Sequence, residues 1–136
     1  MNRLQELFNR IEAQNPDENE VVVSLDEFFA GNEDPASIGP NLGAEQPLIA
    51  EFYSVFQSIR DRPDVQDVLV RITECIPDEW PFADTVYILS SASKDEIESL
   101  VAPLKPDDVV VDWMYGKPLE APGLAFDTYI YSVWWD

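Results

Sequence analysis

Residues 45–75, EQPLIAEFYSVFQSIRDRPDVQDVLVRITEC, change their hydrophobic period halfway along, and this change decides the fold. In the first half, apolar residues recur every three or four positions, which predicts an amphipathic helix from Glu45 to about Arg60. After Arg62-Pro63 the period becomes two, which predicts a half-exposed strand over 64–75. One face of that strand holds Val68, Val70 and Ile72, and the other holds Asp67, Leu69, Arg71 and Thr73.

Upstream of this segment, the sequence predicts a helix, a short strand and a loop. Leu4, Leu7, Phe8 and Ile11 fall at helical spacing, so a helix is expected over about 2–14. Residues 20–24 contain three consecutive valines and are predicted to form a strand. Ser24 and Glu27 form a capping-box pattern that starts one or two helical turns. Glycines and prolines then recur over about 31–47, which predicts a loop.

Downstream, the sequence predicts one more helix and up to three strands. Residues 85–89 are an apolar run of strand length, expected to be covered on both faces. Ser93 and Glu96 form a second capping box, which starts a helix that Pro103 ends. Residues 109–115 fit either a strand or a short helix, with the strand favoured. Residues 128–135 alternate like a strand, which places Trp134 and Trp135 on opposite faces.

The order of these elements predicts the fold class. The chain has 136 residues and a mass of 15.5 kDa, which suits a single domain over 1–136. Helices interleaved with strands predict an α+β domain with a mainly antiparallel sheet of four or five strands. Two or three helices are expected to pack on one face of that sheet.

Composition excludes several classes of function. Residues 1–62 carry 4 basic and 12 acidic side chains, and residues 63–136 carry 4 and 15, so the net charge is −19 and is spread along the chain. Such a charge argues against direct nucleic-acid binding and against anionic membranes. The chain has no histidine and one cysteine, Cys75, which argues against histidine catalysis and zinc sites. Neither a cofactor, a metal site nor a catalytic residue is predicted.

Composition also predicts where the protein is located and what kind of partner it binds. The first residues lack the apolar core of a signal peptide, and the single cysteine has no partner for a disulfide, so a cytoplasmic protein is expected. Cys75 is expected to be a small apolar residue that is buried or half-buried. A surface of acids and aromatic rings fits a basic protein partner, because the rings supply contact area and the acids match Arg and Lys. The candidate partner-binding residues are Glu33, Asp34, Asp107, Asp108, Asp112, Trp113, Tyr115, Trp134 and Asp136.

Three further stretches of the chain carry a resemblance to a known group of proteins. They are residues 24–42 (SLDEFFAGNEDPASIGPNL), residues 80–87 (WPFADTVY) and the closing residues 131–136 (YSVWWD). The chain resembles immunity proteins of bacterial polymorphic toxin systems. This resemblance implies a non-enzymatic cytoplasmic inhibitor that binds a cognate toxin and covers the basic active-site region of a nuclease-like target.

Three other functions remain open from the sequence. A DNA mimic would use carboxylates in place of phosphates to block a DNA-binding protein. A small hydrolase or lyase would use carboxylates and would need one acid with a strongly raised pKa in a pocket. A structural or regulatory subunit would use the C-terminal strand as an edge for self-association.

Overall fold

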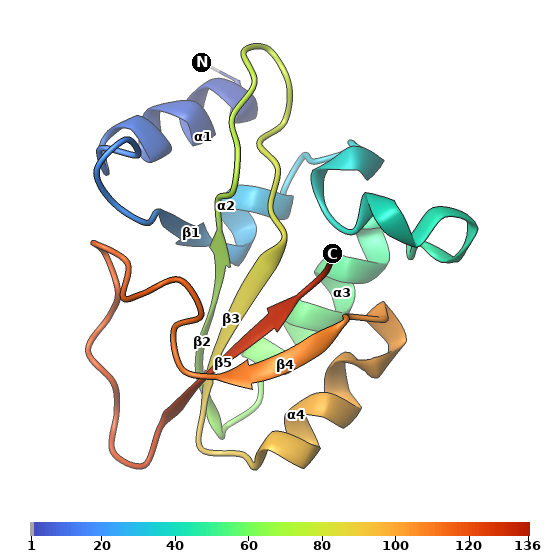
Figure 1. Cartoon of the computed structure of the whole chain (residues 1–136), viewed down its shortest axis with the longest axis vertical. Helices are drawn as coiled ribbons and strands as arrows, with labels where there is room; N and C mark the ends of the chain where they lie inside the picture. Colours follow the sequence, from blue (N-terminus) through green and yellow to red (C-terminus); the bar gives the residue numbers. More distant parts are fainter. Residues whose placement is uncertain (1) are drawn as a thin grey trace.

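A five-stranded sheet lies at the centre of the computed structural model, which describes residues 2–136 (Figure 1). In space the strands follow the order β1-β2-β3-β5-β4, and every neighbouring pair is antiparallel. The α+β class and the antiparallel sheet are therefore confirmed. The strands are β1 (Val22–Ser24), β2 (Val65–Arg71), β3 (Thr85–Ser90), β4 (Asp108–Val111) and β5 (Tyr129–Trp134).

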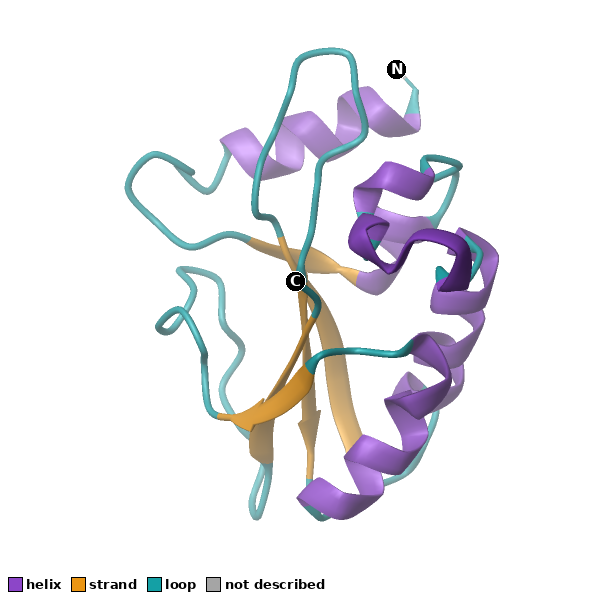
Figure 2. Cartoon of the chain, turned by 45° about the vertical axis from the view of Figure 1, so that its right-hand side comes forward, coloured by secondary structure: helices purple, strands orange, loops and turns teal. Residues whose placement is uncertain are grey.

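The helices gather on one side of the sheet, whereas the other side carries irregular chain (Figure 2). Helix α1 crosses the end of the molecule near β1, and α3 and α4 run along the sheet. The α-helices are α1 (Arg3–Glu12), α2 (Leu25–Phe29), α3 (Ile49–Arg60) and α4 (Lys94–Val101). The 3-10 segments are η1 (Pro35–Ser37), η2 (Pro40–Glu45) and η3 (Ala102–Leu104).

The capping patterns explain where α2 and α4 begin. At α2 the box is complete: Ser24 Oγ accepts from the Glu27 N–H at 3.0 Å, and the Glu27 carboxylate accepts from the Ser24 N–H at 2.8 Å. At α4, Ser93 Oγ accepts from the Glu96 N–H at 3.2 Å. The Glu96 carboxylate does not reach back as predicted, because it accepts from Arg62 at 2.5 Å.

Helix α3 begins at Ile49, four residues after the predicted start at Glu45. Proline disfavours helical backbone in the residue before it, and Gln46 is accordingly extended ahead of Pro47. The glycine- and proline-rich stretch that precedes α3 is a loop, as predicted, and it is ordered into η1 and η2.

The main core lies between the helices and one face of the sheet. Trp135 is its last member, with 3% of its surface exposed, and its Nε1 donates to the Leu104 carbonyl at 2.9 Å. The Trp135 ring meets Phe52 and Phe56 edge-on, with centroids 5.6 and 6.3 Å apart. Gly39 lies against this cluster with φ +62, and a Cβ there would come within 3.2 Å of the Phe52 ring.

The second face of the sheet is also covered, which corrects the prediction of a half-exposed β2. Leu69, on the face expected to meet solvent, is only 7% exposed. It belongs to a second cluster with Val22, Tyr87, Leu89 and Ile130. Residues 112–128, which connect β4 to β5 and are called the strap below, fold back over this cluster (Figures 1 and 2). The alternation of apolar and polar residues in β2 shows which residues share a face. It does not show that the strap, which is distant in sequence, packs on the face predicted to be exposed.

Two smaller predictions also meet the structure here. Residues 108–111 form β4, so the strand is confirmed over the helix in the 109–115 segment, although it is shorter than predicted. Cys75, expected to be buried or half-buried, is exposed on the long connection between β2 and β3. Within residues 2–136, no helix is long and apolar enough to cross a bilayer.

Candidate functional site

The predicted partner-binding residues fall into three places. Glu33 and Asp34 lie just before η1, away in sequence from the rest. Asp107, Asp108, Trp134 and Asp136 lie together at one end of the β4–β5 pair, where Asp108 is the register partner of Trp134. Asp112, Trp113 and Tyr115 begin the strap at the other end of β4. The fold thus joins the second and third groups through one short edge strand.

Several of these acids hold the backbone in place as well as carrying charge. Asp34 caps η1 by accepting from the Ala36 N–H at 2.9 Å. Asp108 and Asp112 each accept from the next residue's N–H, at 2.8 and 2.7 Å. Asp107 accepts from the backbone N–H of Asp136. Glu33, Asp107, Asp108, Asp112 and Asp136 are all exposed, so their charges face solvent.

Most of the large exposed apolar side chains among the described residues lie on the strap or directly beside it in sequence. Seven of the nine large hydrophobic side chains that are exposed lie between positions 111 and 129. Phe126 is the extreme case, with 93% of its surface exposed. Five of the seven lie on the strap itself, and we call them the strap surface: Met114, Tyr115, Leu119, Leu124 and Phe126. The other two, Val111 and Tyr129, belong to β4 and β5 and share the helix-side face of the sheet with Tyr131.

Of the strap surface, only Tyr115 is among the binding residues predicted from the sequence. Leu119, Leu124 and Phe126 lie in a segment whose glycines and prolines predicted a loop, and a loop prediction assigns no role to its side chains. The signal that marks them is large apolar residues within a connection of turn-forming residues, where solvated loops usually carry polar side chains.

Two aromatic rings of the strap pack against the sheet, and one of them, Tyr115, is also partly exposed. The Trp113 ring meets Tyr87 edge-on at 4.7 Å, and the Tyr115 ring covers the Arg71 guanidinium at 3.6 Å. Polar contacts add to this at three points along the strap. Met114 N–H donates to Ser132 Oγ at 3.2 Å, Glu120 accepts from Arg10 at 2.5 Å, and Gln66 bonds Gly123 and Ala125, each at 2.8 Å.

Arg71 is the charged centre beneath the strap. Its side chain is 11% exposed and pairs with Glu20 at 2.9 Å and Asp84 at 3.3 Å, so its charge is neutralised locally. Next to it, the Tyr87 hydroxyl is buried with no hydrogen-bond partner among the described residues. Burial raises the pKa of Tyr87 well above its ordinary value. The Nε1 of Trp134, also on this face, is likewise buried and unpartnered within residues 2–136.

Most arginines form ion pairs with acidic side chains of the same chain. Four of the five, Arg10, Arg60, Arg62 and Arg71, form ion pairs with seven carboxylates among the described residues. Hydrogen bonds from Tyr53, Arg62 and Arg10 lower the pKa values of Asp26, Asp64 and Glu120 respectively. This leaves 20 of the 27 acids outside any ion pair in the described chain.

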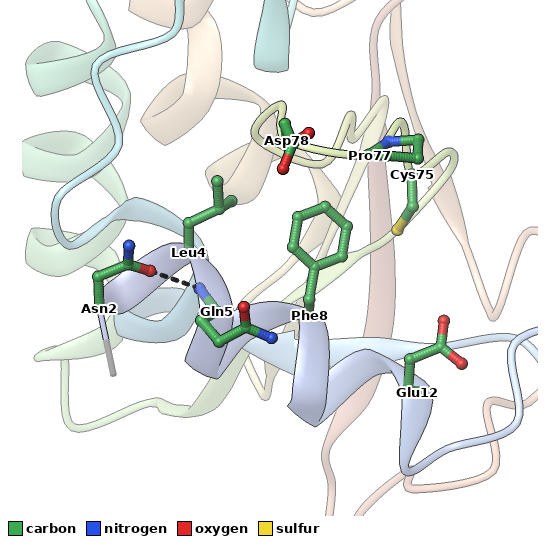
Figure 3. A pocket seen from close by; sticks show the side chains of 8 residues that line it. All are labelled: Asn2, Leu4, Gln5, Phe8, Glu12, Cys75, Pro77 and Asp78. Carbon is green, nitrogen blue, oxygen red and sulfur yellow. Dashed lines mark hydrogen bonds between the residues drawn. The ribbon is translucent and has the colours of Figure 1, made fainter.

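A pocket lies between α1 and the connection from β2 to β3 (Figure 3). Its volume is about 430 Å³, and its apolar lining includes Leu4, Phe8 and Pro77. Glu12 and Asp78 bring carboxylates to it, and Cys75 lies at its edge. Although Cys75 as a whole is exposed, partial desolvation of its thiol by neighbouring atoms raises its pKa, and the charges of Glu12 and Glu74 raise it further. A raised pKa disfavours the reactive thiolate. Within the described residues, no three His, Cys, Asp or Glu side chains group as metal ligands.

The fold and the strap surface define a class: a small acidic α+β protein with one antiparallel sheet and an exposed apolar connection. The chain belongs to the family described as "Uncharacterized protein YfbO family", whose model matches residues 2–133. It is similar to the protein named "Uncharacterized protein YfbO" of Escherichia coli (strain K12), with 32% identity over 126 residues, which cover 92% of this chain and 89% of that relative. No solved structure matches the chain.

Proposed function

We propose that this chain is a non-enzymatic cytoplasmic binding protein of the immunity type, which neutralises a basic toxin or nuclease by covering its surface. The observation that carries the proposal is the strap surface: exposed apolar side chains gathered on one connection of a strongly acidic protein. Several large apolar side chains exposed on one segment of a small acidic protein are typical of a contact surface for another macromolecule.

Aromatic and aliphatic side chains on the strap supply the contact area that anchors a protein partner. Interface energy concentrates in a few large side chains that become fully desolvated, and aromatic rings are prominent among them. Phe126 is such a ring, and Leu119 and Leu124 add aliphatic area near it in sequence. We therefore assign the anchoring role to the strap surface.

Charge supplies the selectivity for a basic partner. The strap carries Asp112, Glu120 and Asp127 against one Lys117, and the chain as a whole is at −19. With most arginines paired internally, the field around the molecule is set by unpaired carboxylates. Such a field speeds association with a positive surface and repels acidic proteins.

Order in the strap favours tight binding. A loop that must be ordered on association lowers the affinity, whereas a loop already held in position does not. Here Trp113, Tyr115 and Gln66 fix the strap to the sheet before any partner arrives.

The proposal is tested by capture and then by inhibition. The purified chain is immobilised, lysate of the producing organism is applied, and bound proteins are eluted with a salt gradient and identified by mass. We expect one basic protein to elute late, and its purified activity to be blocked by one equivalent of the chain. Absence of a stoichiometric basic partner, or a partner whose activity the chain leaves intact, contradicts the proposal.

A variant pair ties the binding to the strap surface. Leu119→Ser combined with Phe126→Ser removes two exposed apolar contacts and is expected to weaken binding about 100-fold, because each anchor contributes about 1–2 kcal/mol. Leu48→Ser, at a side chain 69% exposed at the start of α3, is the matched control and should bind like the unaltered chain. Equal losses of binding affinity in the double variant and in Leu48→Ser would show that the strap surface is not the contact surface.

A further inference from the structure

The pocket between α1 and the β2–β3 connection is built by two elements far apart in the sequence (Figure 3). Helix α1 presents Leu4, Phe8 and Glu12 to it from successive turns, and Pro77 and Asp78 face them from the connection. Asp78 holds a positive φ of 64, which shapes the tip of that connection. The volume of about 430 Å³ is within the range of cavities that take a specific group.

The lining divides into an apolar floor and two acidic ends. Figure 3 shows the Phe8 ring standing in the middle of the pocket, with Leu4 and Pro77 on either side. The Asp78 and Glu12 carboxylates lie beyond the ring at different edges. Within the part of the chain that the structure describes, neither carboxylate has an ion-pair or hydrogen-bond partner. An aromatic face flanked by free carboxylates attracts a cation that also carries an aliphatic stem.

Among residues 2–136, no Lys or Arg side chain lines this pocket. Arg10 is tied to Glu27 at 3.1 Å and to Glu120 at 2.5 Å. Arg3 packs along Gly31, where a Cβ would lie 3.5 Å from its side chain, so it occupies the side of α1 that faces the α2 end. The whole β2–β3 connection, residues 72–84, contains four acids and no Lys or Arg. The side chains of the described residues therefore supply no cation to the pocket that would offset the charges of Glu12 and Asp78.

We propose that this pocket receives one arginine or lysine side chain of the basic protein partner, with its aliphatic stem on Phe8 and its charged head between Glu12 and Asp78. The inference rests on the proposed function for the source of that side chain. It adds a second contact, separate from the strap surface. This contact selects a partner side chain by both its positive charge and the length of its aliphatic stem. The chemistry required of the occupant is a flexible apolar stem that ends in a cation.

The test uses the full chain and needs no partner. Amide chemical shifts are followed by NMR while Nα-acetyl-arginine amide is added, with Nα-acetyl-citrulline amide as an uncharged ligand of the same shape. We expect saturable shifts at Phe8, Glu12, Cys75, Ile76 and Asp78. Binding of the citrulline compound should be weaker by about tenfold or more, because only arginine gains from the carboxylates. The arginine compound should also slow alkylation of Cys75 by N-ethylmaleimide.

Two variants complete the test. Glu12→Gln with Asp78→Asn keeps the shape of the pocket and is expected to reduce arginine binding to the citrulline level. Asp61→Asn with Asp95→Asn removes the same charge from exposed sites at α3 and α4 and should leave binding within about twofold. Equal shifts from both ligands, or shifts outside the pocket, overturn the inference. Because no partner enters the titration, this result and the capture experiment fail independently.

Discussion

Gln14 does at the residue scale what a neighbouring strand would do for β1. Its side chain is fully buried, its Nε2 donates to the Val22 carbonyl at 2.8 Å, and its Oε1 accepts from the Val22 N–H at 3.3 Å. These two contacts close an edge that would otherwise present unpaired backbone groups. The sequence gives little sign of this, because a glutamine after an amphipathic helix is usually solvated.

Gln14→Leu is expected to lower the free energy of unfolding by about 1–3 kcal/mol, since the Val22 backbone groups would stay buried without partners. Urea denaturation measures the change. Gln5→Leu, at an exposed position on α1, serves as the control and should stay within about 0.5 kcal/mol of the unaltered chain. A Gln14→Leu protein as stable as that control would show that the edge needs no closure.

Tyr87→Phe is expected to leave stability unchanged or to raise it by up to about 1 kcal/mol, because its buried hydroxyl has no hydrogen-bond partner in the described chain. The pH dependence gives a second readout. The folded chain keeps the Tyr87 proton after the unfolded chain has lost it, so stability falls as pH rises above about 10.

Urea unfolding of Tyr87→Phe at neutral pH and above about pH 10 tests both points, and the alkaline loss of stability should be smaller in the variant. A clear destabilisation at neutral pH would contradict the account, because it would mean that the hydroxyl makes a valuable bond in the folded protein.

At the scale of elements, the sequence predicted the helices and strands well and their coverage less well. The alternation in β2 and the three- and four-residue spacing in α3 involve residues only a few positions apart, so these two elements can be predicted from the sequence. Burial of Leu69 depends on Trp113, which is 44 positions distant and joined to it only by tertiary structure. The same limit explains the candidate site: Asp112, Trp113 and Tyr115 were found by composition, whereas Phe126 was not.

Trp113→Ala is expected to release the strap from the sheet. Loss of its contact with Tyr87 should speed amide hydrogen exchange across residues 112–128 and lower stability by about 2 kcal/mol, with little change in α3. Leu124→Ala, at an exposed position on the same strap, should exchange like the unaltered chain. Exchange that rises uniformly over the whole protein would contradict an independently held strap.

At the scale of the whole molecule, the net charge of −19 opposes compaction, and the seven side-chain ion pairs among residues 2–136 only partly offset it. Unpaired carboxylates repel one another over distances that salt screens. The repulsion costs stability in the free protein, and association with a basic surface relieves it.

Raising sodium chloride from about 0.05 M to about 0.5 M is therefore expected to increase the melting temperature by a few degrees, as followed by circular dichroism. Screening of the 20 acids that form no ion pair within the described residues should outweigh the weakening of exposed ion pairs. A melting temperature that falls with salt would show that the ion pairs, and not the repulsion, dominate.

Site-specific photocrosslinking tests the central claim, that the strap surface contacts a basic protein, most directly. A photoreactive phenylalanine analogue is placed at position 126 or at position 119, and at position 48 as an exposed control far along the chain, and crosslinking is carried out in cells of the producing organism. We predict one basic protein joined at 126 and 119 and absent at 48. Equal crosslinking at position 48, or none at 126, would contradict the account.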